Sequence, residues 1–172
     1  MRAACGFYNR VQPSLFIAID PGASGAYVIR RPDGVIAEVG EYGEPKDVVK
    51  VCAFLRANNL SVFPIVAVIE RVWGSPVMGV SAAFAFGENY GGWCMAMRVA
   101  GIPLFSVTPQ AWQKVVAPNI VGQGPDRKRQ LKARAAALFP DFRVTLTNAD
   151  ALLLSQYCVE QLRVGGPLGE PL

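Results

Sequence analysis

Two short stretches of the sequence are apolar at every position, and each runs directly into an acid. Leu15–Ile19 reads LFIAI and precedes Asp20, and Pro64–Ile69 reads PIVAVI and precedes Glu70. Strands with one wet face alternate apolar and polar residues, whereas short continuous apolar runs are typical of strands buried on both faces. The sequence therefore predicts a sheet covered by helices on both sides, which is an α/β fold.

The remaining segments predict how the sheet is built. Two further strands, at 25–31 and 35–39, flank a Pro-Asp-Gly turn that is typical of a hairpin. A short strand is expected at 103–107. Helices are expected at 45–58, at 81–100, from Thr108-Pro109 onwards, over the basic segment that ends at Phe139, and from about 148 to 163. We expect a mixed five-stranded sheet in one domain spanning residues 15–163, between an N-terminal tail (1–14) and a C-terminal tail (164–172).

Composition excludes several classes of site. The 172 residues contain no histidine, which excludes Ser-His-Asp and Cys-His nucleophilic sites and any zinc site that needs imidazole. The four cysteines lie more than 40 residues apart without a CxxC pair, which is typical of reduced core residues in a cytosol-like compartment. The longest uncharged stretch, 16 residues from Val72 to Gly87, is shorter than the roughly 20 apolar residues of a membrane span. We therefore expect no membrane association, and the N-terminus has no apolar core of a secretory signal.

A basic segment lies around the end of the third quarter of the chain. Residues 126–134 (DRKRQLKAR) carry five basic side chains and one acid, within a protein whose net charge is +4. A local basic patch is the electrostatic footprint of a polyanion partner. The alternative is an ordinary solvated helix face.

Three acids stand in apolar surroundings. Asp20 and Glu70 close the two buried strands, and ligand sites of α/β sheets collect at the carboxyl ends of strands. Asp150 lies in the first turn of the last helix, where its own face continues with Leu153, Leu154 and Tyr157. Acids in such surroundings are usually paired or bound to a cation, and hard oxygen ligands favour Mg²⁺ or Mn²⁺.

Each acid also has a structural interpretation. Asp20 could simply open the Asp-Pro-Gly turn, and Glu70 could pair with Arg71 or Arg98 at a strand end. Asp150 could complete a capping box with Thr147. The joint arrangement of two strand ends and one helix start favours the cation site.

Five blocks in order carry a family resemblance. FIAIDPGASGAYVI, AVIERVWG, GENYGGWCMAM…GIPLFSVTPQAWQKVV, the basic helix ending AALFP, and NADALLLSQY together resemble the RuvC-type Holliday-junction resolvases, most of all the bacteriophage and chloroplast branches. The resemblance covers residues 15–163. It implies a ribonuclease H-like fold, a homodimer, and Mg²⁺-dependent, structure-selective nicking of paired strands at a four-way DNA junction.

The resemblance also assigns the site. It matches Asp20, Glu70 and Asp150 to the family's catalytic acids, which hold Mg²⁺ (or Mn²⁺), two ions per site. In two-metal hydrolysis the ions lie about 3.5–4 Å apart, one activating water and one stabilising the leaving oxygen. Asp20 would bridge them, Glu70 would bind the ion on the nucleophile side and Asp150 the other. Phosphate contacts are expected from Lys114, Lys128, Arg129 and Lys132, and Trp73 or Met78 is expected to wedge at the junction centre.

Two positions depart from the family pattern. Thr147 stands three residues before the last acid, where many members carry an acid or a histidine, and Gly22 stands where the chloroplast branch has a second acid. The second ion would then be held by water, by Asn148, or weakly.

Other functions remain open from the sequence. A junction-binding module with little activity, or a broader ribonuclease H-like nuclease that acts on RNA or branched DNA, would fit the same blocks. DPGASGA also resembles the phosphate turn of actin-like kinases, but these need two such domains and a second glycine-rich loop. We expect no nucleotide cofactor, and location in the cytoplasm of a bacterial or phage-infected cell rather than an organelle stroma.

Overall fold

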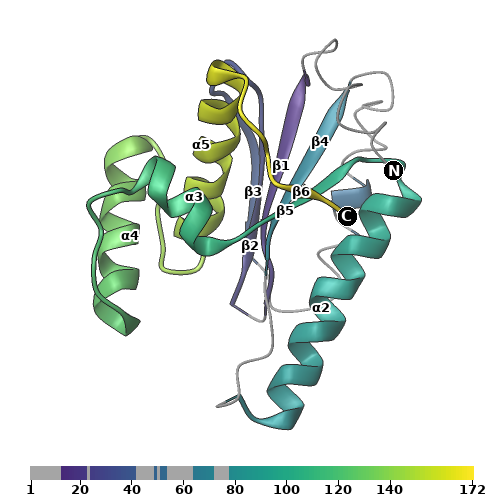
Figure 1. Ribbon diagram of the computed structural model, residues 1–172, viewed down its shortest axis with the longest axis horizontal. Coiled ribbons are helices and arrows are strands. Elements are labelled where there is room, and N and C mark those ends of the chain that lie inside the picture. Colours follow the sequence, from purple (N-terminus) through teal and green to yellow (C-terminus); the bar gives the residue numbers. More distant parts are fainter. Residues whose placement is uncertain (1–12, 23, 42–48, 50, 54–63, 72–77) are drawn as a thin grey trace.

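The strands form one mixed sheet with the two apolar runs at its centre. The computed structural model describes residues 13–22, 24–41, 49, 51–53, 64–71 and 78–172 (Figure 1). Its sheet has the order β3-β2-β1-β4-β5-β6. The strands are β1 (Leu15–Asp20), β2 (Ala26–Arg30), β3 (Ile36–Glu41), β4 (Ile65–Glu70), β5 (Leu104–Val107) and β6 (Glu170–Pro171). The predicted mixed α/β sheet is therefore confirmed.

The direction of the strands changes at β1. β1, β2 and β3 form an antiparallel meander, in agreement with the predicted hairpin, whereas β4 and β5 run parallel to β1. β1 and β4 are buried on both faces because helices cover both sides of the sheet. This burial explains why their sequences lack the alternation of a half-exposed strand.

The sheet has six strands rather than the predicted five. β6 comes from the C-terminal segment, whose glycines and prolines predict a loose tail. It pairs antiparallel with β5 and so forms the edge of the sheet, and Arg71 forms an ion pair with Glu170. A two-residue strand is too short to show a side-chain periodicity, so the sequence could not predict it.

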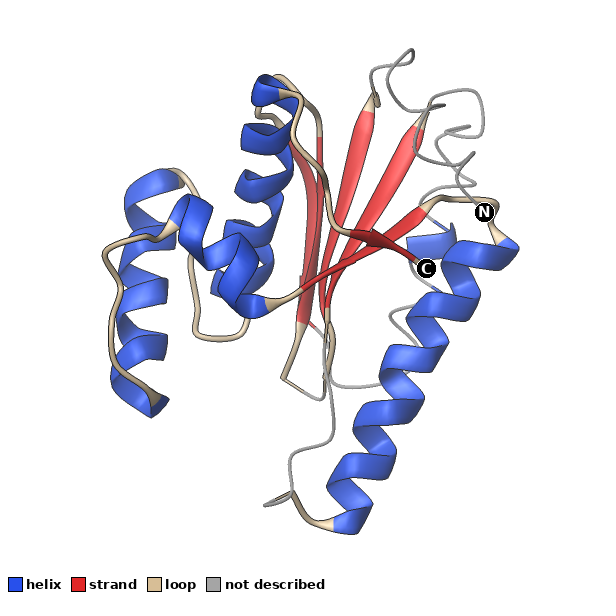
Figure 2. Cartoon of the chain, in the orientation of Figure 1, coloured by secondary structure: helices blue, strands red, loops and turns tan. Residues whose placement is uncertain are grey.

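Helices cover the two faces unequally (Figure 2). One face carries α3 (Pro109–Val116), α4 (Gly124–Leu138) and α5 (Ala149–Val164), of which α5 lies directly on β1 and β2. The other carries α2 (Val80–Val99), whose N-terminal half extends past the sheet. Each face has its own buried core, one centred on α5 and the other on Trp93 and Met97 of α2.

The predicted helices agree with the observed ones where the chain is described. Thr108 caps α3 by accepting a hydrogen bond from Ala111 N–H at 3.3 Å, with Pro109 at the first position. Of the helix predicted at 45–58, Val49 and residues 51–53 are helical and the others lie outside the described residues. No helix of the described part of the chain is both long and apolar enough to cross a membrane.

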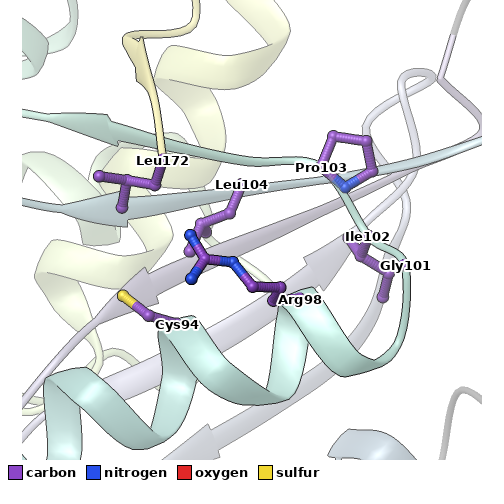
Figure 3. A pocket seen from close by; sticks show the side chains of 7 residues that line it. All are labelled: Cys94, Arg98, Gly101, Ile102, Pro103, Leu104 and Leu172. Carbon is purple, nitrogen blue, oxygen red and sulfur yellow. The ribbon is translucent and has the colours of Figure 1, made fainter.

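One cavity lies beside the C-terminal end of α2. It has a volume of about 230 Å³. Its lining residues are Cys94, Arg98, Gly101, Ile102, Pro103, Leu104 and Leu172 (Figure 3). The cavity lies where β5 begins. It is therefore at the end of the parallel strands opposite to the acids that end β1 and β4.

Candidate active site

Asp20 and Glu70 end neighbouring parallel strands. Ile19 of β1 is in register with Ile69 of β4, so the acid that follows each isoleucine lies at the same edge of the sheet. The five residues before each acid are buried, and the acids themselves are partly exposed. The strands therefore hold both carboxylates rigidly at the boundary between core and solvent.

Asp150 reaches the same edge from α5. Its helix packs along β1 and β2, and the residues around Asp150 on that helix are almost all buried. Asn148 is the N-cap residue of α5 and no side chain caps the helix, so the capping box of Asp150 with Thr147 does not form. Asp150 is left free for another role.

The three acids interact electrostatically. Burial, followed by repulsion from Glu70 and Asp150, raises the pKa of Asp20 well above its ordinary value. Burial raises the pKa of Glu70 to about 7, and repulsion from Asp150 adds to the effect. Burial also raises the pKa of Asp150. A cation bound at this sheet edge would relieve the repulsion among the three acids.

Lys128 of α4 is the base that all three acids share. Its charge lowers the pKa of Asp20, of Glu70 and of Asp150, against the larger effect of burial. Arg127 acts in the same direction on Asp150. The sequence placed Lys128 on a DNA-binding face; its proximity to the acids was not predicted, because it depends on how α4 packs on α5.

The Glu70 carboxylate accepts a hydrogen bond from a buried tryptophan. The indole Nε1–H of Trp112 donates to Glu70 Oε2 at 2.6 Å. Arg71, a candidate partner of Glu70 from the sequence, instead pairs with Glu170 of β6. Trp112 was not among the predicted site residues, since nothing in the spacing of residues 70 and 112 indicates contact.

The turn after Asp20 is tied to α2. Gly22 has a φ of +131°, and its N–H donates to Asn89 Oδ1 at 2.9 Å. A Cβ at Gly22 would lie 3.0 Å from the Phe86 ring, and one at Gly25 would lie 2.1 Å from the carbonyl oxygen of Asp20. Both glycines are therefore required for the chain to turn so closely behind the acid.

Asn148 is occupied by its own loop. Its side chain accepts a hydrogen bond from Thr145 N–H at 2.9 Å and donates to Glu41 Oε1 at 2.9 Å and to the Arg143 carbonyl at 3.2 Å. The residue is buried, and this network joins the loop before α5 to the end of β3. These bonds give Asn148 a structural role that the sequence did not indicate.

The basic residues of α4 separate into two groups. Arg127 donates to Gln113 and to the carbonyls of Ile120 and Gly122, and Arg134 donates to the Val116 carbonyl, so these two bind the protein itself. The predicted phosphate contacts Lys114, Lys128 and Arg129 are exposed, and Lys132 is half-buried; Arg129 also pairs with Asp126. Of the two candidate wedge residues, Met78 is partly exposed and Trp73 lies outside the described residues.

The donor set fits a divalent cation in chemistry. All three acids are oxygen donors, and the ion pairs of the described residues involve none of them. Among those residues, no three His, Cys, Asp or Glu side chains converge closely enough to form a finished metal site. The edge thus has the charge and the donors that Mg²⁺ prefers, with the side chains spread apart.

Comparison with known proteins bears on the fold. No family model matches the chain, and no curated protein matches it. A structure of RuvC from Thermus thermophilus superposes with a TM-score of 0.63 at 17% identity, covering 92% of this chain and 99% of that one. The fold is that of RuvC. A second structure, T. thermophilus RuvC in complex with a Holliday junction substrate, has a TM-score of 0.60 at 16% identity with the same coverage. The ribonuclease H-like fold expected from the sequence blocks is therefore confirmed.

Proposed function

We propose that this protein is a structure-selective endonuclease that resolves four-way DNA junctions by Mg²⁺-dependent hydrolysis of phosphodiesters. The observation that carries the proposal is the meeting of Asp20, Glu70 and Asp150 at one sheet edge, in a fold shared with RuvC. The neighbour bound to a Holliday junction supports four-way DNA as the substrate class. The absence of histidine is compatible with this chemistry, which carboxylates can support.

The three carboxylates are the residues that would hold Mg²⁺, or Mn²⁺ in its place. When bound, such ions activate water and stabilise the leaving oxygen of a phosphodiester. The backbones of Asp20 and Glu70 are held side by side by neighbouring parallel strands, so binding an ion would require movement of the side chains and not of the strands. Lys128 offsets the repulsion among the acids and is exposed, so in this proposal it also contacts the phosphate beside the bond to be cut.

DNA affinity is proposed to come from Lys114, Lys128, Arg129 and Lys132. Lys114 lies in the last turn of α3 and the others lie on α4, on the same side of the sheet as Asp150. Phosphate contacts position a duplex without reading its sequence, so the choice of junctions would come from shape and deformability. Trp73 and Met78 remain the proposed wedge residues, on sequence grounds.

A homodimer is proposed through the outer face of α2. Val80, Phe84, Met95 and Val99 are 88%, 68%, 58% and 76% exposed and recur at helical spacing, opposite the buried Trp93 and Met97. A Cβ at Gly91 would meet nothing within 4 Å, so a second backbone could approach there. A self-complementary helix face about a two-fold axis would place two sites for paired nicks.

We propose the cytoplasm of a bacterial or phage-infected cell as the location of the protein, in agreement with the free Cys52, Cys94 and Cys158.

A cleavage gel tests the function. End-labelled four-way junction and linear duplex with the same arm sequences are incubated with Mg²⁺, with Mn²⁺ or with EDTA. We expect paired, symmetric nicks in the junction only, lost with EDTA and in Asp20→Asn. The matched control is Asp33→Asn, which removes an acid from the β2–β3 turn at the opposite end of the sheet and should cleave normally.

Two other outcomes would replace the proposal. Tight junction binding without nicks, even in Mn²⁺, would favour a junction-binding module, an alternative supported by the loop role of Asn148 and by the spread of the acids. Equal cutting of duplex, RNA hybrids and junctions would indicate a broader ribonuclease H-like nuclease.

A further inference from the structure

Trp112 lies entirely within the core yet directs its one polar atom to the candidate site. Its side chain is fully buried among α3, α5 and the sheet. An indole has a single N–H and no acceptor, so a buried tryptophan can satisfy that group with one partner only. The partner here is Glu70 Oε2, at 2.6 Å.

The position of the indole follows from the end of β5. Val107 is in register with Glu70, and Arg71 N–H donates to the Val107 carbonyl at 2.7 Å, so β5 ends beside Glu70. The chain then enters α3 through Thr108 and Pro109, and Trp112 follows within the first turns. The strand register and the capped start of α3 therefore aim the indole back at the carboxylate.

The bond constrains one of the two carboxylate oxygens. Oε2 is the acceptor, and the hydrogen bond lowers the pKa of Glu70 against the effect of burial. The hydrogen bond to Oε2 restricts rotation of the Glu70 carboxylate and so fixes the direction of its other oxygen, Oε1. Partners of this kind orient metal ligands, and their loss typically reduces metal affinity by roughly 10–100-fold.

We propose that Trp112 is a positioning residue that orients Glu70 for divalent-cation binding through its indole N–H. This inference rests on the proposed function in one respect, that Glu70 binds the cation. It assigns to a core tryptophan a role that packing alone would not require.

The test measures cation binding directly. Mn²⁺ binding is followed by isothermal titration calorimetry in wild type, Trp112→Phe and Trp93→Phe. Phenylalanine keeps an aromatic ring and removes the donor. Trp93 is the matched control because it is equally buried in the core on the other face of the sheet. We expect Trp112→Phe to weaken Mn²⁺ binding by about 10-fold or more, and Trp93→Phe to bind as wild type does.

A double-mutant cycle separates orientation from general loosening. If Trp112 acts through Glu70, adding Trp112→Phe to Glu70→Gln should cause no further loss of Mn²⁺ affinity. Unchanged affinity in Trp112→Phe, an equal loss in Trp93→Phe, or a full further loss in the Glu70→Gln background would each overturn the proposal.

A measurement on the intact protein covers the case in which Trp112→Phe fails to fold. In ¹⁵N-tryptophan-labelled protein, with Trp73→Phe and Trp93→Phe used for assignment, Mg²⁺ should shift the Trp112 indole N–H resonance and leave that of Trp93 in place. No shift under saturating Mg²⁺ would overturn the inference. Wild type that binds no Mn²⁺ would overturn the proposed function as well, whereas normal junction cleavage with a normal Trp112→Phe titration would overturn this inference alone.

Discussion

At the scale of single residues, the three acids of the candidate site lower the stability of the folded protein. Carboxylates in protein surroundings lose hydration, and those of Asp20, Glu70 and Asp150 also repel one another. The strands do not need acids at positions 20 and 70 in order to form, since the positions before them are apolar. Such local destabilisation is typical of a binding site, because a ligand that neutralises the charge restores the stability.

The pH dependence of stability follows from these pKa values. Burial raises the pKa of Glu70 from its ordinary 4.5 to about 7. An acid whose pKa is higher in the folded state binds its proton more tightly there, so its contribution to stability is complete below about pH 4.5 and is lost as the pH rises through 7. In EDTA we expect the melting temperature of wild type to fall between pH 5 and pH 8 for this reason.

Asp20→Asn tests how much the repulsion among the acids lowers the stability. The variant removes one of the repelling charges, so in EDTA at pH 8 it should melt a few degrees above wild type; roughly 2–4 °C corresponds to 1 kcal/mol in a chain of this size. Asp33→Asn, at the distant hairpin turn, should melt as wild type does. Differential scanning calorimetry with and without Mg²⁺ measures both, and a melting temperature of Asp20→Asn below that of wild type at pH 8 would contradict the account.

How far the site could be predicted also depends on the residue. Asp20 and Glu70 could be found because each interrupts an apolar run, and the local signal survives without knowledge of the fold. Trp112 could not, because its bond to Glu70 requires the register of β4 with β5 and the direction in which α3 leaves the sheet. The loop role of Asn148 was missed for the same reason: its partner Glu41 is 107 residues away.

At the scale of elements, α4 divides its basic side chains between two tasks. Arg127 and Arg134 hold backbone carbonyls of the preceding segment, while Lys128 and Arg129 are exposed. The sequence predicted the helix, whose inner face buries Leu131 and Ala135. It could not show which bases are internal, because that depends on the carbonyls that the loop before α4 presents.

The exposed lysines give a prediction about salt. Lys128→Ala with Lys132→Ala should weaken binding to junction and duplex alike and reduce the slope of log affinity against log salt by roughly 2, since each phosphate contact contributes about 0.9. The matched double variant Arg31→Ala with Arg163→Ala removes two exposed charges that lie off α4 and already pair with acids. Its slope should not change. Fluorescence anisotropy across a salt series compares them, and equal slopes in both double variants would make α4 an ordinary solvated face.

At the scale of the whole molecule, the described helices cover the two faces of the sheet differently. Three helices lie on the face under α5, whereas on the other face α2 buries Trp93 and Met97 out of its 20 residues. Sequence predicted the length of α2 correctly. Its exposure was not predictable, because apolar residues occur all around the helix and give no clear inward face.

The exposed face of α2 predicts the oligomeric state. Phe84→Glu with Met95→Glu should convert the proposed dimer to a monomer, because charges would meet across a two-fold contact. The control Val164→Glu alters an equally exposed apolar residue at the end of α5 and should leave the dimer intact. Sedimentation equilibrium gives the masses, and a wild-type chain that is monomeric at micromolar concentration would remove α2 as the dimer surface.

The central position of β1 in the sheet affects where the protein opens locally and exchanges its amide protons. β1 is hydrogen-bonded along both edges, to β2 and to β4, and lies under helices on both faces. Amide protons in such a strand exchange with solvent only when the whole domain opens, whereas edge strands and helix ends exchange through small local openings. We therefore expect Asp20 and Glu70 to lie on the slowest-exchanging part of the protein, and β6 to open and close at the edge of the sheet while β1 and β4 stay paired.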